Sequence, residues 1–540
     1  MSSNARVAAL FAAVLALTVF YAGLRWGALV AGGADSYGYV SQAGLWQQGS
    51  VIVEEDVIRS SPWPLAAATW APLGYRPSPH RPDAIVPLYA PGLPLLMALV
   101  QTMAGYCGAF LVVPLCGALT IWLTYALGRR VFDTPGIALW GAGLVATSPV
   151  FLYQLMNAMS DVPVTAAWSL ALVLTVSRRS LAGGLAMSAA IAIRPNLVPL
   201  AALLLVWIVL SGTARAVPTA PRVSRPYAAA TLFTIGLVPS IAGIAWLNGR
   251  LYESALTSGY GTTADYYSLG YLPTNVRQFA SWMANVETPT VLLAGLYFGV
   301  PRLFAPAKIP LARPLLGGSI ATVVLSYVFY RPFDAWWYLR FLLPMWPVMM
   351  LLTAGALEAI ARPMARAARR LVIGALVAAL AWHGVVEAAT RHVFDLGRGE
   401  RRYIDVARFI ESHTDPDAVM LSVQHSGSLR LYANRLTLRY DVLDPEWLDR
   451  TVAYLQSIGR RPYFVLDGGE VDAFKQRFGA LNRSGALNWP ALATLGPIVS
   501  VYDPLDRQPG TTPLAIGSTR GPRRGWCDPP QIWPPLLRMK

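Results

Sequence analysis

Long apolar runs, separated by short connectors that carry arginine, occupy most of the first 390 residues. A helix that crosses a bilayer needs about 20 apolar residues, and residues 7–30 meet that length. We predict about eleven spans, several of them shorter than a full crossing. They cover roughly residues 7–30, 109–128, 137–157, 163–177, 180–193, 197–211, 227–247, 287–301, 314–329, 341–361 and 371–390. The pattern predicts an all-α polytopic membrane bundle over residues 1–390.

The chain after residue 390 has the composition of a soluble region. Residues 403–413, 445–458 and 471–478 have helix-like patterns, and they alternate with short β-branched and aromatic runs at 418–423, 463–466 and 498–502. We expect a small external α/β domain at 391–505 with a mainly parallel sheet. It shows no catalytic constellation, so we expect it to be structural or to shape the acceptor side. Residues 506–540 are rich in Pro, Gly and Arg and are expected to form an irregular tail.

Composition supports the membrane assignment. The chain is 55% hydrophobic and 14% charged, with a mean hydropathy of +0.43, which excludes an ordinary soluble protein. The net charge of +15 does not predict a nucleic-acid partner, because the arginines lie mainly in connectors between apolar runs. Cys107, Cys116 and Cys527 are too few and too scattered for a disulfide framework or a metal motif, so we expect them to be unpaired, with Cys116 buried in a helix; a Cys107–Cys527 bridge is the disfavoured alternative.

The charged connectors predict the topology. Alternate connectors hold Arg129–Arg130, Arg178–Arg179, the arginines of 215–225, the basic residues of 302–313 and those of 362–370. The positive-inside rule places them, and the N-terminus with Arg6, in the cytoplasm. A cleavable signal peptide is the alternative for the first run. The odd number of spans then places 391–540 outside a cytoplasmic (inner) membrane, facing the periplasm.

An apolar segment at 93–104 could be counted as one more span, but it is too short to cross. We interpret residues 92–105 as a helix on the outer membrane surface, inside a long external loop at 31–108. The other external connectors carry polar residues, at 157–162, 193–196, 248–286 and 330–340. Polar groups therefore converge on one face of the bundle.

Several of these external motifs, in this order, resemble the GT-C fold glycosyltransferases, especially the protein O-mannosyltransferases and the lipid A aminoarabinose transferases. The motifs are Asp35 after the first span, Tyr89-Ala90-Pro91-Gly92-Leu93-Pro94-Leu95-Leu96, Met159-Ser160-Asp161-Val162-Pro163, Arg194-Pro195-Asn196, Asn248 with Ser258-Gly259-Tyr260, and Arg340-Phe341-Leu342-Leu343-Pro344. They extend over most of residues 1–350.

The resemblance implies a polyprenyl-phosphate-linked sugar donor, transfer on the external face, and a lipid, glycan or protein acceptor. It implies no nucleotide sugar, which agrees with the lack of a glycine-rich phosphate loop beside a strand. Two positions depart from the family pattern. Ser36 stands where many relatives have a second acidic residue, and Gly38 stands where the aminoarabinose transferases have an arginine. Either change could alter donor-phosphate contacts or the use of a divalent metal ion, so the metal requirement stays open.

Two carboxylates are the candidate catalytic residues. Sugar transfer requires a base for the acceptor hydroxyl, and acidic residues at membrane boundaries are costly unless they have a function. Asp35 is the candidate general base; alternatively, it caps a short helix over residues 36–47. Asp161 is expected to face Asp35 and to position the acceptor or a divalent cation; alternatively, it starts the helix before Pro163.

Arginines are the candidate ligands of the donor phosphate, because the departing phosphate must be held by positive charge. Arg194 interrupts an apolar stretch, so an anion explains it better than lipid does, although snorkelling to headgroups is the alternative. Arg340 and, more weakly, Arg331 have the same assignment.

Aromatic residues beside these charges could form the sugar and acceptor pocket. Tyr89, Tyr260 and Trp337 are the candidates, and an interfacial aromatic belt is the alternative. His80 stands alone in its loop and does not predict a metal site.

These observations favour a glycosyltransferase. A transporter or flippase of a lipid-linked saccharide is a second hypothesis, which the scarcity of charge within the central helices disfavours. A non-catalytic envelope scaffold is the third.

Overall fold

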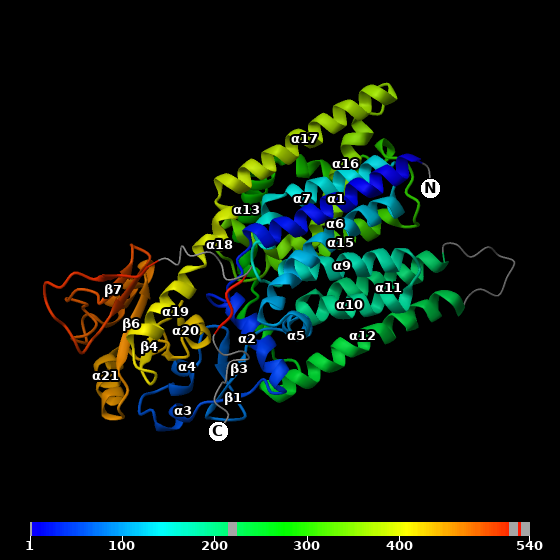
Figure 1. Cartoon of the computed structure of the whole chain (residues 1–540). Coiled ribbons are helices and arrows are strands. Elements are labelled where there is room, and N and C mark those ends of the chain that lie inside the picture. Colours follow the sequence, from blue (N-terminus) through cyan, green and yellow to red (C-terminus); the bar gives the residue numbers. More distant parts are fainter. Residues whose placement is uncertain (1–2, 214–223, 518–526, 531–540) are drawn as a thin grey trace.

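The computed structural model describes residues 3–213, 224–517 and 527–530 and divides into a helical bundle and a mixed sheet with its own helices (Figure 1). The sheet lies at one end of the bundle, and the N-terminus lies at the opposite end. The bundle contains α1 (Ser3–Trp26), α6 (Val112–Val131), α7 (Pro135–Thr147), α8 (Pro149–Leu155), α9 (Asp161–Val176), α10 (Ser180–Ile193), α11 (Val198–Thr213), α12 (Ser224–Leu251), α13 (Leu272–Trp282), α15 (Ala312–Val328), α16 (Trp346–Ile360) and α17 (Arg366–Thr390).

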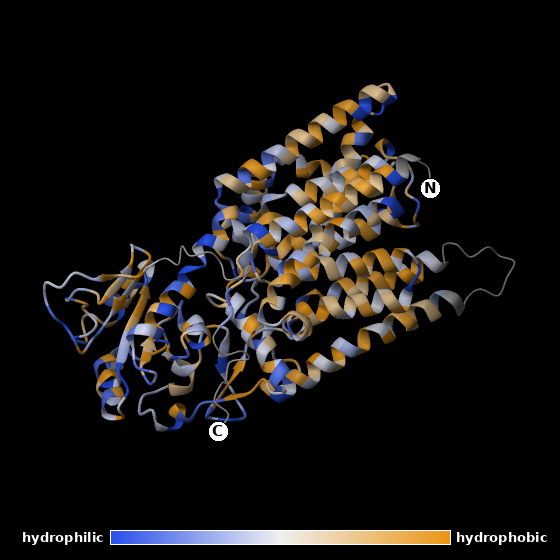
Figure 2. Cartoon of the chain, in the orientation of Figure 1, coloured by the Kyte–Doolittle hydropathy of each residue, from blue (hydrophilic) through white to orange (hydrophobic). Residues whose placement is uncertain are grey.

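Hydrophobic residues predominate along the bundle helices, as Figure 2 shows. Within the described residues, six helices are long and apolar enough to cross a membrane, or seven if the bent pair α7 and α8 counts as one span. That pair bends by 61°, and five further apolar helices are shorter. The chain is therefore a multi-pass membrane protein, while the number of eleven spans stays a prediction.

The expected span at 287–301 contains only a short piece of α-helix. Residues 287–301 begin at the end of a π-helix, Met283–Glu287, and continue as a 3-10 helix, Pro289–Gly295, followed by α14 (Leu296–Gly299). Pro289 and Pro301 each remove a backbone N–H from this segment, which prevents one regular α-helix. The other ten expected spans all fall on helices of the bundle.

The basic connectors share one end of the bundle. The Lys308 backbone N–H donates to the Val131 carbonyl at 2.9 Å, and Arg130 Nε donates to Ser177 Oγ at 2.5 Å. Helix α9 runs from Asp161 to Val176, next to this basic end, so Asp161 lies at the other end. Arg215 and Arg222 lie outside the described residues.

The loop at 31–108 is folded. It contains α2 (Asp35–Gln48), α3 (Asp56–Ser60), α4 (Ala66–Trp70), α5 (Gly92–Ala104), and an antiparallel sheet of β1 (Val53–Glu54), β2 (Tyr75–Pro77) and β3 (Ala84–Pro87) in the order β1-β3-β2. The helix predicted over 92–105 is confirmed as α5. Its side chains Leu95, Leu99 and Met103 are exposed and recur every four residues, so they form one apolar face, which suits a helix lying on a bilayer.

The C-terminal sheet has six strands in the order β5-β4-β6-β8-β7-β9. They are β4 (Val419–Leu421), β5 (Leu436–Leu438), β6 (Pro462–Asp467), β7 (Ala493–Leu495), β8 (Val499–Tyr502) and β9 (Leu514–Ala515). Strand β4 is parallel to β5 and β6, as expected, but β8 is antiparallel to both β6 and β7. The sheet is therefore mixed. The antiparallel pairing of β7 with β8 follows from the short turn through Gly496, because a turn of this length can join only antiparallel strands.

Four helices accompany this sheet: α19 (Arg402–His413), α20 (Ser426–Tyr432), α21 (Leu448–Ser457) and α22 (Gly468–Phe478). Residues 506–540 were expected to be irregular, but β9 lies within them. Its pairing with β7 shows that this part of the tail completes the sheet.

The sheet region packs on the folded loop. Tyr432 accepts a hydrogen bond from the Ala31 N–H at 2.8 Å, and Arg430 Nη2 donates to the Trp70 carbonyl at 2.7 Å. A disulfide joins Cys107 to Cys527, so the expectation of unpaired cysteines was wrong for these two. Their separation of 420 residues hides the pairing in the sequence, and the packing of the C-terminal region on the loop brings them together.

Candidate active site

Four of the predicted charged residues line one cavity of about 780 Å³. Asp35 begins α2, Asp161 begins α9, Arg194 follows α10, and Arg340 lies in the 3-10 helix Trp336–Met345 before α16. The sequence separates these residues by up to 305 positions. The bundle brings them to one place because each stands at a helix end or break on the same side.

Asp35 is held by two hydrogen bonds. Tyr89 Oη donates to Oδ1 at 2.7 Å, and Arg340 Nη1 donates to Oδ2 at 3.1 Å. Helix α2 has Ala34 at its N-cap, with no side-chain capping bond. The carboxylate of Asp35 therefore points to the cavity residues and does not cap the helix, and its side chain keeps 26% exposure.

Gly38 makes room for this arrangement. A Cβ atom at residue 38 would collide with the ring of Tyr89, the donor to Asp35. Thus the departure noted at residue 38 has a local physical reason, since any side chain there would displace the tyrosine.

Asp161 and Arg194 form a buried ion pair. Arg194 Nη2 donates to Asp161 Oδ1 at 2.7 Å and to Ser160 Oγ at 3.0 Å. Asp161 is the first residue of α9, and its side chain is only 1% exposed. A carboxylate that is buried and paired in this way positions its neighbours better than it accepts a substrate proton.

Both arginines keep an N–H that could bind a ligand. Arg194 Nη1 and Arg340 Nε are buried and have no hydrogen-bond partner among the described residues. Leaving such donors unpaired is unfavourable, so a ligand acceptor is expected there. The phosphate of a substrate has the oxygens to satisfy them.

Tyrosines form much of the cavity wall. Tyr89 and Tyr260 both line it, with ring centroids 5.9 Å apart, and Tyr39 lies 4.4 Å from Tyr89. Besides Tyr39, nine further aromatic residues on the wall were not among the predicted pocket residues: Tyr153, Tyr252, Tyr266, Tyr267, Tyr327, Tyr330, Phe333, Tyr338 and Phe341. In the sequence, aromatic residues of a pocket have the same pattern as an aromatic belt at the membrane interface.

The structure does not bring Arg331 or Trp337 to the wall. Arg331 is exposed, and its backbone N–H donates to the Tyr266 carbonyl at 2.8 Å. Trp337 stacks behind Tyr153, with centroids 5.8 Å apart and planes within 8°. The imidazole Nε2 of His80 lies 2.7 Å from the Tyr252 carbonyl oxygen.

Within the described residues, no three His, Cys, Asp or Glu side chains group together to hold a metal ion. Asp161, which was considered as a ligand of a divalent cation, is paired with Arg194 and not with a second acidic side chain.

Glu400 also lines the cavity, although its sequence context did not predict it. It follows α18 (Leu396–Gly399), and Arg402 Nη1 donates to its Oε1 at 3.0 Å. Burial raises the pKa of Glu400, and the charge of Arg402 opposes this rise. No signal in the sequence distinguishes this residue from an ordinary glutamate of a soluble region.

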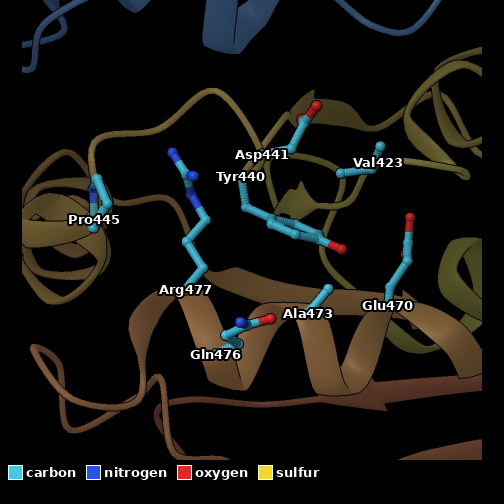
Figure 3. Close-up of a pocket in the computed structure, with 8 residues that line it drawn as sticks. All are labelled: Val423, Tyr440, Asp441, Pro445, Glu470, Ala473, Gln476 and Arg477. Carbon is cyan, nitrogen blue, oxygen red and sulfur yellow. The ribbon is translucent and has the colours of Figure 1, made fainter.

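A second pocket, of about 550 Å³, lies beside α22 in the sheet region (Figure 3). Glu470 of this pocket accepts backbone hydrogen bonds from Gln424 at 3.0 Å and Asp467 at 2.9 Å, while Asp441 pairs with Arg439. Burial raises the pKa of Glu470 to about 7. Because both carboxylates are engaged in holding the local backbone and an ion pair, the cavity around Asp35 is the better candidate for catalysis.

Comparison with solved structures identifies the fold. ArnT from Cupriavidus metallidurans bound to undecaprenyl phosphate is similar over 95% of this chain and 100% of that chain, with 14% identity and a TM-score of 0.60. Its apo state gives 14% identity over the same shares and a TM-score of 0.57. This chain has the GT-C fold.

An archaeal oligosaccharyltransferase, AglB from Archaeoglobus fulgidus, also matches, with 12% identity, a TM-score of 0.48, and coverage of 90% of this chain and 72% of that chain. No protein-family model and no curated protein sequence matches the chain. The GT-C fold thus becomes visible through the arrangement of elements and not through sequence identity.

Proposed function

We propose that this chain is a glycosyltransferase that moves a sugar from a polyprenyl-phosphate donor to a hydroxyl acceptor. One observation carries the proposal: the carboxylate of Asp35 shares a cavity with two arginines that each have an unpartnered buried N–H. A base and a cationic phosphate site are the two groups that this reaction requires. The ArnT of similar fold was solved with undecaprenyl phosphate bound, which agrees with a lipid-phosphate donor.

Each group has a defined task in the proposed reaction. The acceptor hydroxyl gives its proton to Asp35 as its oxygen attacks the anomeric carbon, and the bond from that carbon to the phosphate oxygen breaks. The leaving polyprenyl phosphate takes the electron pair and is stabilised by Arg194 Nη1 and Arg340 Nε. Attack from the side opposite the phosphate inverts the anomeric centre. Tyr89 and Arg340 orient the carboxylate, and each carboxylate oxygen retains a lone pair for the acceptor proton.

We propose that the cavity faces the periplasm in an inner membrane. The basic connectors gather at the opposite end of the bundle, as the positive-inside rule requires for this orientation. A disulfide between the loop at 31–108 and the C-terminal region supports it, because disulfides persist in oxidising compartments. Membrane lipids then surround the bundle and supply the donor.

The test compares the wild-type protein with Asp35→Asn, using undecaprenyl-phosphate-linked hexoses and pentoses as donors and lipids, oligosaccharides and peptides as acceptors. Release of undecaprenyl phosphate is measured with each acceptor. We expect a loss of at least about 100-fold for Asp35→Asn, the usual contribution of a general base. An exposed residue of the sheet region, Asp472→Asn, is the matched control and should retain full activity. Equal turnover by Asp35→Asn would remove the base assignment, and no turnover with any donor would remove the proposed function.

A further inference from the structure

Glu400 is a carboxylate of the cavity wall that comes from the C-terminal part of the chain. Its side chain is 24% exposed, so it is partly buried but still accessible. Arg402 occupies Oε1, and no described residue donates a hydrogen bond to Oε2. The wall therefore contains one carboxylate oxygen with its hydrogen-bonding capacity free.

The surroundings of Glu400 place it on one side of the site. Tyr153, Arg340 and Glu400 all line this cavity. Arg402, the partner of Glu400, has its Nε 3.8 Å from Oδ2 of Asp467, where β6 of the C-terminal sheet ends. Figure 1 shows α18, directly before Glu400, between the bundle and the sheet. Glu400 thus marks the side of the cavity that faces the sheet, and the Asp161–Arg194 pair is set into the bundle helices α9 and α10.

We propose that Glu400 binds the acceptor and that the acceptor presents a neutral sugar at this position. The proposal rests on the function proposed above. Oε2 accepts a hydrogen bond from a sugar hydroxyl, since an ionised carboxylate is an acceptor only. The ring of Tyr153, fixed by stacking on Trp337, packs against the C–H face of the same sugar. Asp35 then receives the proton of the hydroxyl that reacts.

The geometry favours a glycan over a peptide. Extended peptides often bind by adding a strand to a sheet edge. None of the residues lining this cavity belongs to a named strand; they come from helices and connectors. A negative charge at the acceptor side also disfavours an anionic acceptor, because like charges repel. Hydroxyls and aromatic rings, in contrast, dominate the wall.

The experiment measures KM separately for donor and acceptor in the wild-type protein, Glu400→Gln and the matched control Glu446→Gln, which changes an exposed glutamate. Neutral oligosaccharides and serine- or threonine-containing peptides are the acceptors, and undecaprenyl-phosphate-linked sugars are the donors. We expect Glu400→Gln to raise the KM for the oligosaccharide about tenfold, the loss of one charged hydrogen bond, with the donor KM unchanged. A raised donor KM, unchanged KM values for both substrates, or a wild-type preference for peptide would each overturn the proposal.

A binding measurement separates this proposal from the proposed function. Oligosaccharide is titrated without donor, and isothermal titration calorimetry measures its binding. If the wild-type protein turns over no donor, the glycosyltransferase proposal fails, but oligosaccharide binding that is lost in Glu400→Gln still supports the role of Glu400. Equal binding by wild type and Glu400→Gln, or no binding by either, overturns it.

Discussion

The two terminal nitrogens of Arg194 have different surroundings, and the proposed reaction gives them different tasks. Nη2 neutralises Asp161, and Nη1 is buried and free to bind a phosphate oxygen. Lysine has a single point-like ammonium, so Arg194→Lys is expected to keep the pair with Asp161 but lose the phosphate contact. We predict a donor KM about tenfold higher, the loss of one charged hydrogen bond, with a thermal unfolding midpoint close to that of the wild type. Kinetics with varied donor and thermal unfolding in detergent measure the two quantities.

Arg194→Ala is the contrasting variant. It leaves Asp161, with 1% exposure, as an unpaired buried charge, which typically costs about 3–5 kcal/mol. The unfolding midpoint should therefore fall clearly in this variant. If Arg194→Lys and the wild type have the same donor KM, Nη1 does not contact the donor phosphate.

At the residue scale, the sequence could predict four charged residues of the cavity and the tyrosines Tyr89 and Tyr260, but not Glu400. Asp35, Asp161, Arg194 and Arg340 are conspicuous because charge is expensive beside apolar runs. Glu400 has no such contrast, since it lies in a segment of soluble composition where glutamate is ordinary. Only the packing of that segment on the cavity reveals it.

The register of α2 controls the orientation of Asp35. Gly38 lies one turn after Asp35 in this helix, and its missing side chain leaves the space that the ring of Tyr89 occupies. We predict that Gly38→Ala displaces Tyr89 and lowers kcat by about tenfold, which corresponds to the loss of one charged hydrogen bond. Tyr89→Phe should have a similar effect, and the double variant should be no worse than either single variant, because both remove the same contact.

A double-mutant cycle on kcat measures this coupling. Gly243→Ala in α12 is the matched control, because a Cβ there has no neighbour within 4 Å. Additive losses in the double variant would show that Gly38 acts on some other contact.

At the element scale, hydrophobic periodicity located nearly all the bundle helices, because burial and lipid exposure both demand apolar side chains over long runs. It failed over 287–301, where proline interrupts an equally apolar run. Hydrophobic periodicity also could not predict that β8 runs antiparallel to β7. That direction depends on the turn at Gly496 and not on the residues of the strand itself.

At the scale of the whole molecule, the C-terminal region is part of the wall of the site. Tyr403 of α19 packs so closely on Gly32 that a Cβ there would collide with its ring, and Gly32 lies three residues before Asp35. Glu400 lines the cavity itself. The boundary that composition predicts at residue 391 therefore separates residues that line the same cavity. Composition records solvent exposure and not contacts between distant segments.

The disulfide between Cys107 and Cys527 ties the C-terminal region to the loop at 31–108. We predict that Cys107→Ser lowers the unfolding midpoint of the purified protein, because removing a disulfide typically costs about 2–5 kcal/mol, and that Cys527→Ser gives the same loss. The double variant should equal either single variant, since each breaks the same bond. Cys116→Ser is the control, because Cys116 is not in a disulfide. Thiol alkylation in denaturant supplies a direct measurement: one cysteine should react before reduction and three after it. Three reactive cysteines before reduction would show that the bond does not form and would remove its support for a periplasmic cavity.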